Sequence, residues 1–280
     1  MNKSILREKK VALIVGSGAL PAVVIAGINR LGIDFAIIKF KGIETTPFNE
    51  EKVIDARFEH IDILFDQLAA KKFNSVICCG YMRPPNLNLN EIEKASREIL
   101  KPIVEKFQIG DEAVFSEILK LFQLKKLEPL SIKDIVPELF PKFEYLTTCR
   151  PKHNDILDTE RCKRIFEIIS PADLGQSLVV RHGACLAVET SLGTDKMLAT
   201  LNLNQNRPFN DIEGGLLYKA PKIEQNPFLD FPVIGERTVL GVKKARLNGI
   251  VIKHSSVIVL RPSETIELAN RLGIFIWSKK

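Results

Sequence analysis

Short apolar runs and stretches with helical spacing follow each other along the first half of the chain. Val11–Val15 is a run of branched apolar residues, which is typical of a buried parallel strand. Helical spacing follows from Val23 to Leu31, and Gly32 is suited to end that helix. The same alternation predicts strands over Phe35–Phe40 and Ser75–Cys79, and helices over Ile61–Lys71, Glu91–Phe107 and Asp111–Phe122. Alternating strands and helices predict right-handed crossovers and a parallel sheet.

The second half carries a different pattern after a break. Phe140–Asp155 contains two prolines and no clear period, so it is predicted to be a linker. Beyond it the pattern predicts helices over Ile156–Ile169, Lys196–Leu201, Glu236–Leu247 and Ser263–Leu272, and strands near Leu178–Arg181, Cys185–Glu189, Gly215–Lys219, Gly249–Lys253, Val257–Leu260 and Ile274–Trp277. The predicted fold class is α/β, with an N-terminal Rossmann-like parallel-sheet domain over residues 1–145 and a second, mixed α/β domain over residues 146–280.

A glycine turn, Gly16-Ser17-Gly18, follows the first predicted strand. Such glycines allow a tight turn and let a phosphate approach backbone N–H groups at the start of a helix. Two features depart from the dinucleotide-binding fingerprint: Pro21 stands at the third glycine position, and lysines 39 and 41 occupy the region of the acidic ribose partner. These departures disfavour classical NAD binding. Two interpretations remain: a tight turn that binds no ligand, or a site that binds another phosphate or nucleotide.

Composition narrows the class of protein. The chain has 280 residues, of which 45% are hydrophobic and 26% charged, an ordinary globular mixture that excludes a disordered or fibrous chain. Lys and Arg number 40 and Asp and Glu 34, so the net charge is +6, well short of the dense basic stripe of a nucleic-acid binder. This modest surplus favours an anionic partner, such as a nucleotide or an acidic membrane surface.

The cysteines and the apolar runs indicate in which cellular compartment the protein is expected. The five cysteines are odd in number and include no C-x-x-C, which suits a reducing cytosol and argues against a structural zinc site. The first ten residues are polar and charged, and runs such as Ala22–Ile28 are too short to span a bilayer. We therefore expect a cytoplasmic protein, with peripheral membrane contact left open.

Asp230 is the most unusual carboxylate, because it stands in the apolar stretch Phe228–Pro232. A buried acid is costly unless it is paired, protonated or bound to a metal. The alternative is that Asp230 caps a turn or the helix at Glu236. Lys219 and Lys222 lie upstream, and they either neutralise phosphates or line a solvated strand edge.

Two further acidic clusters could bind a hard cation such as Mg²⁺, which takes oxygen ligands. Asp111 and Glu112 follow a glycine, and Glu189 and Asp195 flank another one. Each cluster could instead cap a helix N-terminus, where Thr194 is a plausible N-cap. The four histidines are scattered without H-x-x-x-H, and the chain has neither a nucleophile elbow nor a Walker-type phosphate loop.

Several of these segments, in this order, resemble the LpxI type of UDP-2,3-diacylglucosamine pyrophosphatase from lipid A biosynthesis. The resemblance covers nearly the whole chain. Three departures are mild: Ser17 stands where the family usually has a glycine, Glu112 replaces an Asp, and Phe231 replaces a Leu. The matching segments are residues 16–21, 83–84, 110–112, 173–176, 186–189, 193–198, 219–222 and 230–238.

The resemblance implies hydrolysis of UDP-2,3-diacylglucosamine by water attack at the α-phosphorus, giving UMP and 2,3-diacylglucosamine 1-phosphate, with Mg²⁺ or Mn²⁺. It makes Asp230, in the C-terminal catalytic domain, the essential carboxylate, either as metal ligand or as base. The implied metal ligands are Asp230, Asp111, Glu112, Glu189 and Asp195. The implied substrate-binding residues are Gly16, Gly18, Ala19, Leu20, Arg83, Gly193, Thr194, Lys219 and Lys222.

A lipid substrate also implies an apolar groove and peripheral contact with the cytoplasmic face of the inner membrane. Phe228, Leu229 and Phe231 either line that groove or belong to the core. No nucleic-acid partner is expected, and a homo-oligomer is left open. Two alternatives remain: a nucleotide-sugar oxidoreductase, suggested by the glycine turn, and a non-catalytic nucleotide-binding protein that binds a UDP-sugar without turnover.

Overall fold

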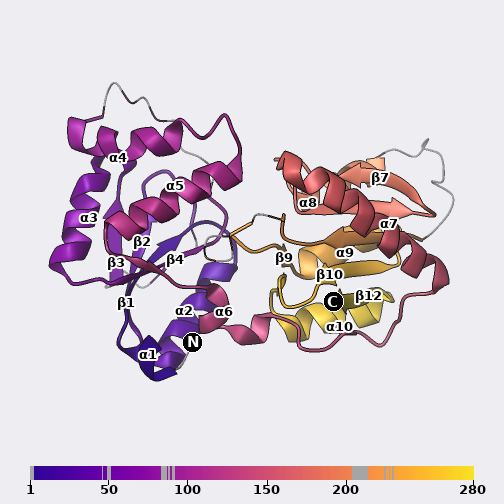
Figure 1. The fold of residues 1–280 in the computed structure, drawn as a ribbon. Helices are drawn as coiled ribbons and strands as arrows, with labels where there is room; N and C mark the ends of the chain where they lie inside the picture. Colours follow the sequence, from indigo (N-terminus) through magenta and orange to yellow (C-terminus); the bar gives the residue numbers. More distant parts are fainter. Residues whose placement is uncertain are drawn as a thin grey trace. The chain divides into compact units, whose positions relative to one another are not determined.

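The computed structural model describes residues 3–45, 47–48, 52–82, 87, 89, 92–203, 214–223, 225–226, 228 and 230–280. The chain divides into two compact units (Figure 1). Met1–Pro137 and Asn226–Asp230 form the first unit, and Glu138–Gln225 and Phe231–Lys280 form the second. Each unit has its own five-stranded sheet with helices, so the predicted α/β class is confirmed. The domain limits of 1–145 and 146–280 stay a prediction.

The sheet of the first unit is parallel, with the order β3-β2-β1-β4-β5. From β1 the chain builds outward to β2 and β3, and then continues on the other side of β1 with β4 and β5. The carboxyl ends of β1 and β4 therefore meet where the strand order reverses, which is where open α/β sheets bind ligands. The strands are β1 Lys10–Val15, β2 Asp34–Phe40, β3 Val53–Ala56, β4 Ser75–Cys79 and β5 Glu128–Pro129.

The helices of the first unit include those that periodicity predicts. α2 ends at Gly32, whose φ of 69° is the left-handed conformation of a helix C-cap. Apolar residues of α3 and α5 pack with those of β1, β2 and β4 into one core cluster. The helical segments are α1 Lys3–Arg7, α2 Leu20–Leu31, η2 Phe58–His60, α3 Ile61–Ala70, α4 Lys94–Val104, α5 Asp111–Leu124 and α6 Ile132–Ile135, followed by η4 Pro137–Leu139 at the end of the unit.

The sheet of the second unit is mixed, with the order β12-β10-β8-β6-β7. β8, β10 and β12 are parallel, whereas β6 is antiparallel to both of its neighbours. A separate parallel pair joins β9 and β11. The strands are β6 Ser177–Arg181, β7 Ala184–Val188, β8 Leu216–Lys219, β9 Val233–Ile234, β10 Gly249–Lys253, β11 Ile258–Val259 and β12 Phe275–Lys279.

Alternating side chains of this second sheet enter two different core clusters, as the pleat of a strand requires. Leu216 and Tyr218 of β8 pack with Phe166 of α7, whereas Leu217 packs with residues of α8, α9 and α10 such as Val239. Both faces of the sheet are therefore covered by helices, which explains why the middle residues of its strands are mainly apolar. The helical segments are α7 His153–Ile169, η5 Ser170–Ala172, α8 Thr194–Leu203, α9 Glu236–Lys244 and α10 Pro262–Leu272.

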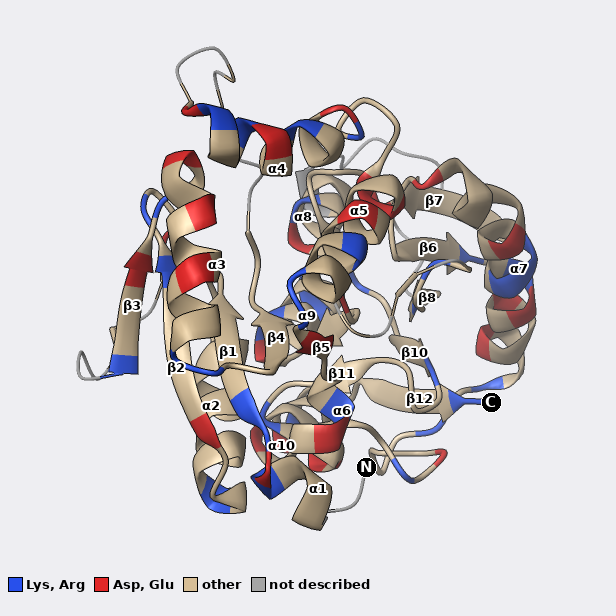
Figure 2. Ribbon diagram, turned by 60° about the vertical axis from the view of Figure 1, so that its left-hand side comes forward, with Lys and Arg blue, Asp and Glu red and all other residues tan. Residues whose placement is uncertain are grey.

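Acidic and basic residues are interspersed on helices of both units. Lys and Arg alternate with Asp and Glu on α4 and α7 (Figure 2). In the part of the chain that the structure describes, no helix combines the length and the apolar character needed to cross a membrane.

Candidate functional site

Four polar side chains gather at one edge of the second sheet. Lys219 is the last residue of β8, and Glu189 directly follows β7. β6 runs in the opposite direction, so its first residue, Ser177, pairs with Lys219 in register, and its carbonyl accepts a hydrogen bond from the Glu189 N–H at 2.8 Å. Thr194 begins α8 at the same edge. This is the carboxyl edge of the parallel strands, where α/β sheets carry their ligand sites.

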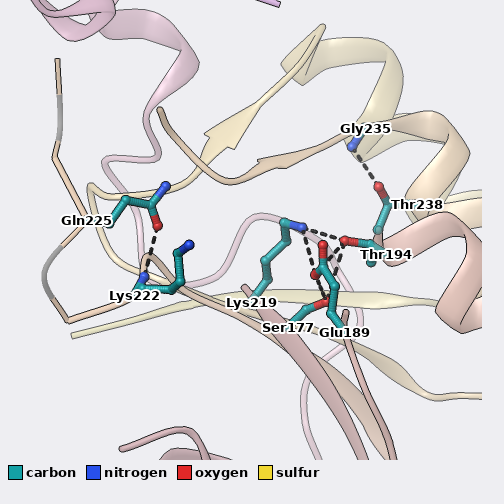
Figure 3. Close-up of polar contacts among 8 residues, drawn as sticks. All are labelled: Ser177, Glu189, Thr194, Lys219, Lys222, Gln225, Gly235 and Thr238. Atoms are coloured by element: carbon teal, nitrogen blue, oxygen red, sulfur yellow. Dashed lines mark hydrogen bonds and ion pairs between the residues drawn. The ribbon is translucent and has the colours of Figure 1, made fainter. Parts of the chain in front are cut away.

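These four residues form one hydrogen-bonded cluster, called the Glu189 network below (Figure 3). The Thr194 hydroxyl donates to Glu189 Oε2 at 2.9 Å and accepts from the Lys219 ammonium at 2.5 Å. The Ser177 hydroxyl donates to the same Oε2, and Lys219 Nζ lies 3.5 Å from it. Oε2 of Glu189 therefore accepts hydrogen bonds from two hydroxyl groups and forms an ion pair with one ammonium.

Three residues of the network are buried, and the fourth, Thr194, is half-buried. Lys219 is 4% exposed, Glu189 8% and Ser177 1%. A buried charge needs an opposite charge and hydrogen bonds to offset its lost hydration, and Lys219 and Glu189 supply these to each other. Gly175 makes room for the main chain at Glu189, because a Cβ on Gly175 would lie 2.4 Å from the carbonyl oxygen of Glu189.

A second buried ion pair joins Lys222 to Asp173, a residue in the left-handed conformation that follows η5. Lys222 is 6% exposed, and its N–H donates to the Gln225 side chain at 2.9 Å (Figure 3). The neighbouring Ile223 N–H binds the Ser170 hydroxyl at 2.8 Å. The segment after β8 is thus fastened to the turn before β6, and this fixes the positions of both predicted phosphate-binding lysines.

The start of α8 differs in detail from the prediction. The Gly193 carbonyl accepts the Met197 N–H at 3.1 Å, so Gly193, with a φ of 86°, takes the N-cap position that Thr194 was predicted to hold. Thr194 is the first helical residue, which releases its hydroxyl for the Glu189 network. Asp195 pairs with Arg237 of α9 at 2.9 Å, on the exposed surface.

In the first unit the glycine turn lies against the turn that follows β4. The Gly16 N–H donates to the Cys79 carbonyl at 2.8 Å, and the Ser17 N–H donates to the Tyr81 carbonyl at 2.8 Å. These two amides are therefore used by the backbone. Gly18, with a φ of 98°, and Ala19 lead into Leu20, where α2 begins without a side-chain cap. The first amides of α2 are the groups that suit an anion at this turn, and the substrate roles of Gly16, Gly18, Ala19 and Leu20 stay predictions. Arg83 lies outside the described residues.

The remaining acidic candidates belong to the first unit. Asp111 and Glu112 stand in the first turn of α5, where Asp111 is exposed and Oε1 of Glu112 is buried. Asp230 is half-buried, and its N–H donates to the Asn226 carbonyl at 3.4 Å. The Phe228 N–H binds the Asn226 side chain at 2.9 Å, so Asn226 accepts hydrogen bonds from the N–H groups of both Phe228 and Asp230.

The aromatic candidates near Asp230 have different surroundings. The Phe231 ring packs edge-to-face on Phe140 at 4.9 Å within the second unit, a contact of the core type. Phe228 is exposed, and Leu229 lies outside the described residues.

The carboxylates differ in how well they suit a divalent cation. Within the described ranges, no group of three or more His, Cys, Asp or Glu residues is arranged to hold a metal ion. Glu189 and Asp195 already face Lys219 and Arg237. The oxygen donors of the remaining candidates fit Mg²⁺, which proteins hold through one or two carboxylates together with substrate phosphates and water. Those remaining candidates are Asp111, Glu112 and Asp230.

Sequence reasoning identified Lys219, Glu189 and Thr194 singly but missed Ser177. Its signal is present: a serine opens the apolar run that follows Asp173–Gln176. Asp173 was part of a matching segment, but its pairing with Lys222 was not foreseen.

Comparisons with known proteins cover both units. The model of the LpxI N-terminal domain matches residues 10–139, and that of the LpxI C-terminal domain matches residues 143–277. The chain is also similar to a protein of Caulobacter vibrioides named UDP-2,3-diacylglucosamine pyrophosphatase LpxI, with 26% identity over 270 residues and 96% of each chain covered. Because both domain models match in order and together span nearly all of the sequence, this chain belongs to the LpxI family.

Proposed function

We propose that this protein hydrolyses the pyrophosphate of UDP-2,3-diacylglucosamine in lipid A biosynthesis. Water would attack the α-phosphorus and release UMP and 2,3-diacylglucosamine 1-phosphate. Family membership and the name of the Caulobacter relative support the substrate. The structural observation that carries the proposal is the pair of buried lysines, Lys219 and Lys222, fixed at the carboxyl edge of the second sheet.

Two fixed ammonium groups suit a pyrophosphate. Lysine donates up to three hydrogen bonds, and hydrogen bonds between charged partners are stronger than neutral ones. The Gly193 N–H is used by the Thr190 carbonyl, at 2.9 Å. The amides of the first turn of α8, from Thr194 onward, add the partial positive charge of a helix N-terminus. These groups would hold the phosphate oxygens and offset their charge as the P–O bond breaks.

Asp230 is the proposed catalytic carboxylate. It would orient the attacking water and accept its proton, or act as a ligand of the divalent ion. When bound, Mg²⁺ or Mn²⁺ would neutralise phosphate charge and lower the pKa of a bound water. Asp111 and Glu112 are the further oxygen donors that we assign to this ion, because Glu189 and Asp195 are already paired with cations.

The acyl chains of this substrate place it in a membrane. We therefore propose that the enzyme works from the cytoplasm at the inner face of the inner membrane. Phe228, exposed beside Asp230 in the sequence, is the described aromatic that suits an acyl chain.

The test is turnover of UDP-2,3-diacylglucosamine with Mg²⁺ in ¹⁸O-water. We expect UMP that carries the label, whereas label in the sugar 1-phosphate alone would place attack at the other phosphorus. Binding without any UMP release would favour the non-catalytic alternative and overturn the proposal.

Substitution of the proposed carboxylate provides a second test. Asp230→Asn should lower kcat by about 100-fold or more, because proton transfer by a positioned group contributes about 10²–10⁴-fold. Asp66→Asn, at an exposed carboxylate on α3, is the matched control and should turn over normally. Removal of divalent ions with EDTA should abolish UMP release, and Mg²⁺ should restore it.

A further inference from the structure

We infer that Glu189 is a positioning residue that holds Lys219 and the Thr194 hydroxyl in a single geometry toward the pyrophosphate. This inference rests on the proposed function. It gives Glu189 a role different from the metal ligation that its sequence context implies.

The first argument is the convergence of donors on Oε2. Ser177 and Thr194 both donate to this oxygen, and Lys219 Nζ lies 3.5 Å from it. A carboxylate oxygen offers about two lone-pair directions, which the two hydroxyl groups already use. A divalent ion at the same oxygen would have to displace hydroxyl donors and approach a buried ammonium. Oε2 of Glu189 is therefore better suited to hold these donors than to bind a metal ion.

The second argument is the rigidity of the arrangement. Glu189 is tied to Ser177 twice, through its N–H to the serine carbonyl and through its side chain to the serine hydroxyl. The main chain at Glu189 is also packed against Gly175, where no Cβ would fit. Because β6 lies between β7 and β8, Ser177 at its start links the carboxylate that follows β7 to the ammonium at the end of β8. Fixed groups need no reorganisation when charge develops on a substrate.

The third argument is the donor capacity of Lys219. An ammonium has three N–H groups. Among the described residues, the network engages it through Thr194, at 2.5 Å, and through the ion pair with Glu189. At least one N–H group thus remains for a phosphate oxygen. Glu189 places an opposite charge beside the buried ammonium, and Thr194 sets the direction in which the ammonium points.

The hairpin formed by β6 and β7 also provides a matched structural control, at the end opposite to the Glu189 network. Asp158 of α7 is 2% exposed, and its carboxylate accepts the His182 N–H at 2.9 Å and the Gly183 N–H at 2.7 Å. These amides lie in the turn between β6 and β7, opposite the strand ends that carry the Glu189 network. Asp158→Asn thus changes a buried carboxylate that binds the turn of this hairpin, and it leaves the residues of the Glu189 network unchanged.

The experiment compares wild type, Glu189→Gln, Thr194→Val, Thr194→Ser and Asp158→Asn for kcat, KM, thermal unfolding and the half-saturating Mg²⁺ concentration. We expect Glu189→Gln and Thr194→Val to lower kcat/KM by roughly 10–100-fold, the range for hydrogen bonds to charged groups. Thr194→Ser, which keeps the hydroxyl, should stay within about threefold of wild type. Asp158→Asn should lower the unfolding temperature but leave kcat/KM unchanged.

Two results would overturn the inference. One is a folded Glu189→Gln enzyme with kcat/KM within about twofold of wild type. The other is a rise of about tenfold or more in its half-saturating Mg²⁺ concentration, the effect expected of a lost metal contact. If Glu189→Gln does not fold, Ser177→Ala replaces it and should lower kcat/KM by about 3–10-fold; no loss there would also overturn the inference.

The inference can be separated from the proposed function. If the wild type releases no UMP, the proposed function fails, and calorimetric titration with UDP then tests the network alone. A loss of UDP affinity of about tenfold in Glu189→Gln, with none in Asp158→Asn, would sustain a phosphate-positioning role. Equal affinities in the three proteins would overturn it.

Discussion

Gly16 and Tyr81 approach so closely that a Cβ on Gly16 would lie 2.4 Å from the Tyr81 carbonyl oxygen. Ser17 and Tyr81 also exchange backbone hydrogen bonds, at 2.8 and 2.9 Å. The turns that follow β1 and β4 are therefore joined directly at the point where the strand order reverses. The glycine at position 16 is required by this contact between backbones, whether or not a phosphate binds nearby.

Gly16→Ala should separate the two turns. Overpacking of this kind costs about 1–3 kcal/mol, which would appear as a lower free energy of unfolding in urea. The Tyr81 amide should also lose protection from hydrogen exchange. Gly18→Ala is the control, because a Cβ there meets nothing within 4 Å and only the positive φ of 98° is strained. Equal loss of Tyr81 protection in both variants would contradict the prediction.

Ser96→Ala should reveal a pH-dependent contribution to stability. The Ser96 hydroxyl donates to Asp62, and this hydrogen bond holds the pKa of Asp62 below its ordinary value of 3.8. A carboxyl with a lowered pKa stabilises the folded state above its unfolded pKa and loses that contribution as the pH falls. The variant should be about 0.5–1 kcal/mol less stable at pH 7, and the difference should shrink below about pH 3.8. Urea unfolding at both pH values measures it; an equal difference at both would contradict the assignment.

Thiol reactivity should separate the cysteines by burial. Burial raises the pKa of Cys162 and Cys79 far above the ordinary thiol range, and raises that of Cys78 to about 12. The thiolate is the reactive form, so these groups should stay unmodified in the folded protein. Partial burial also raises the pKa of Cys185, but this side chain is exposed enough to meet a reagent, so Cys185→Ser should remove a site that a thiol reagent modifies slowly at pH 8. Cys162→Ser should leave the native reaction unchanged, and a native signal from Cys162 would count against the fold at α7.

Lys222→Met should weaken substrate binding. The loss of a charged hydrogen bond to phosphate predicts a KM higher by roughly 10–100-fold, measured in the UMP-release assay. Lys243→Met removes an exposed charge at the end of α9 and should leave KM unchanged. A Lys222→Met enzyme with normal KM, or a Lys243→Met enzyme with the same defect, would show that the Asp173 pair serves stability alone.

Periodicity predicted the central elements of the first unit because they are long and buried. β1 begins one residue before the predicted strand, and α2 begins three residues before the predicted helical spacing and ends at the same residue. β3 and β5 were missed for a physical reason. β3 has four residues, one of them acidic, and β5 has two residues that end in proline. These edge strands exist because β2 and β4 offer them hydrogen-bonding partners, information that their own sequences do not carry.

The residues of the candidate site also divide into those that a local sequence pattern reveals and a contact that depends on the assembled sheet. Lys219 and Glu189 attract attention as charged residues at the ends of apolar runs, so a local pattern suffices to find them. Their pairing depends on the antiparallel register that brings Ser177 beside Lys219, 42 positions apart in the printed numbering. That contact arises only once the sheet is assembled.

The chain crosses between the two units more than once, and this limits how the units can be exchanged between relatives by recombination. Asn226–Asp230 belongs to the first unit, although the residues on both sides of it belong to the second. The polypeptide thus changes unit after Pro137, after Gln225 and after Asp230. A recombination event at the first of these points would exchange an N-terminal cassette without the segment that carries Asp230. We therefore expect chimaeras of relatives joined near residue 137 to be poorer enzymes than those that also transfer residues 226–230.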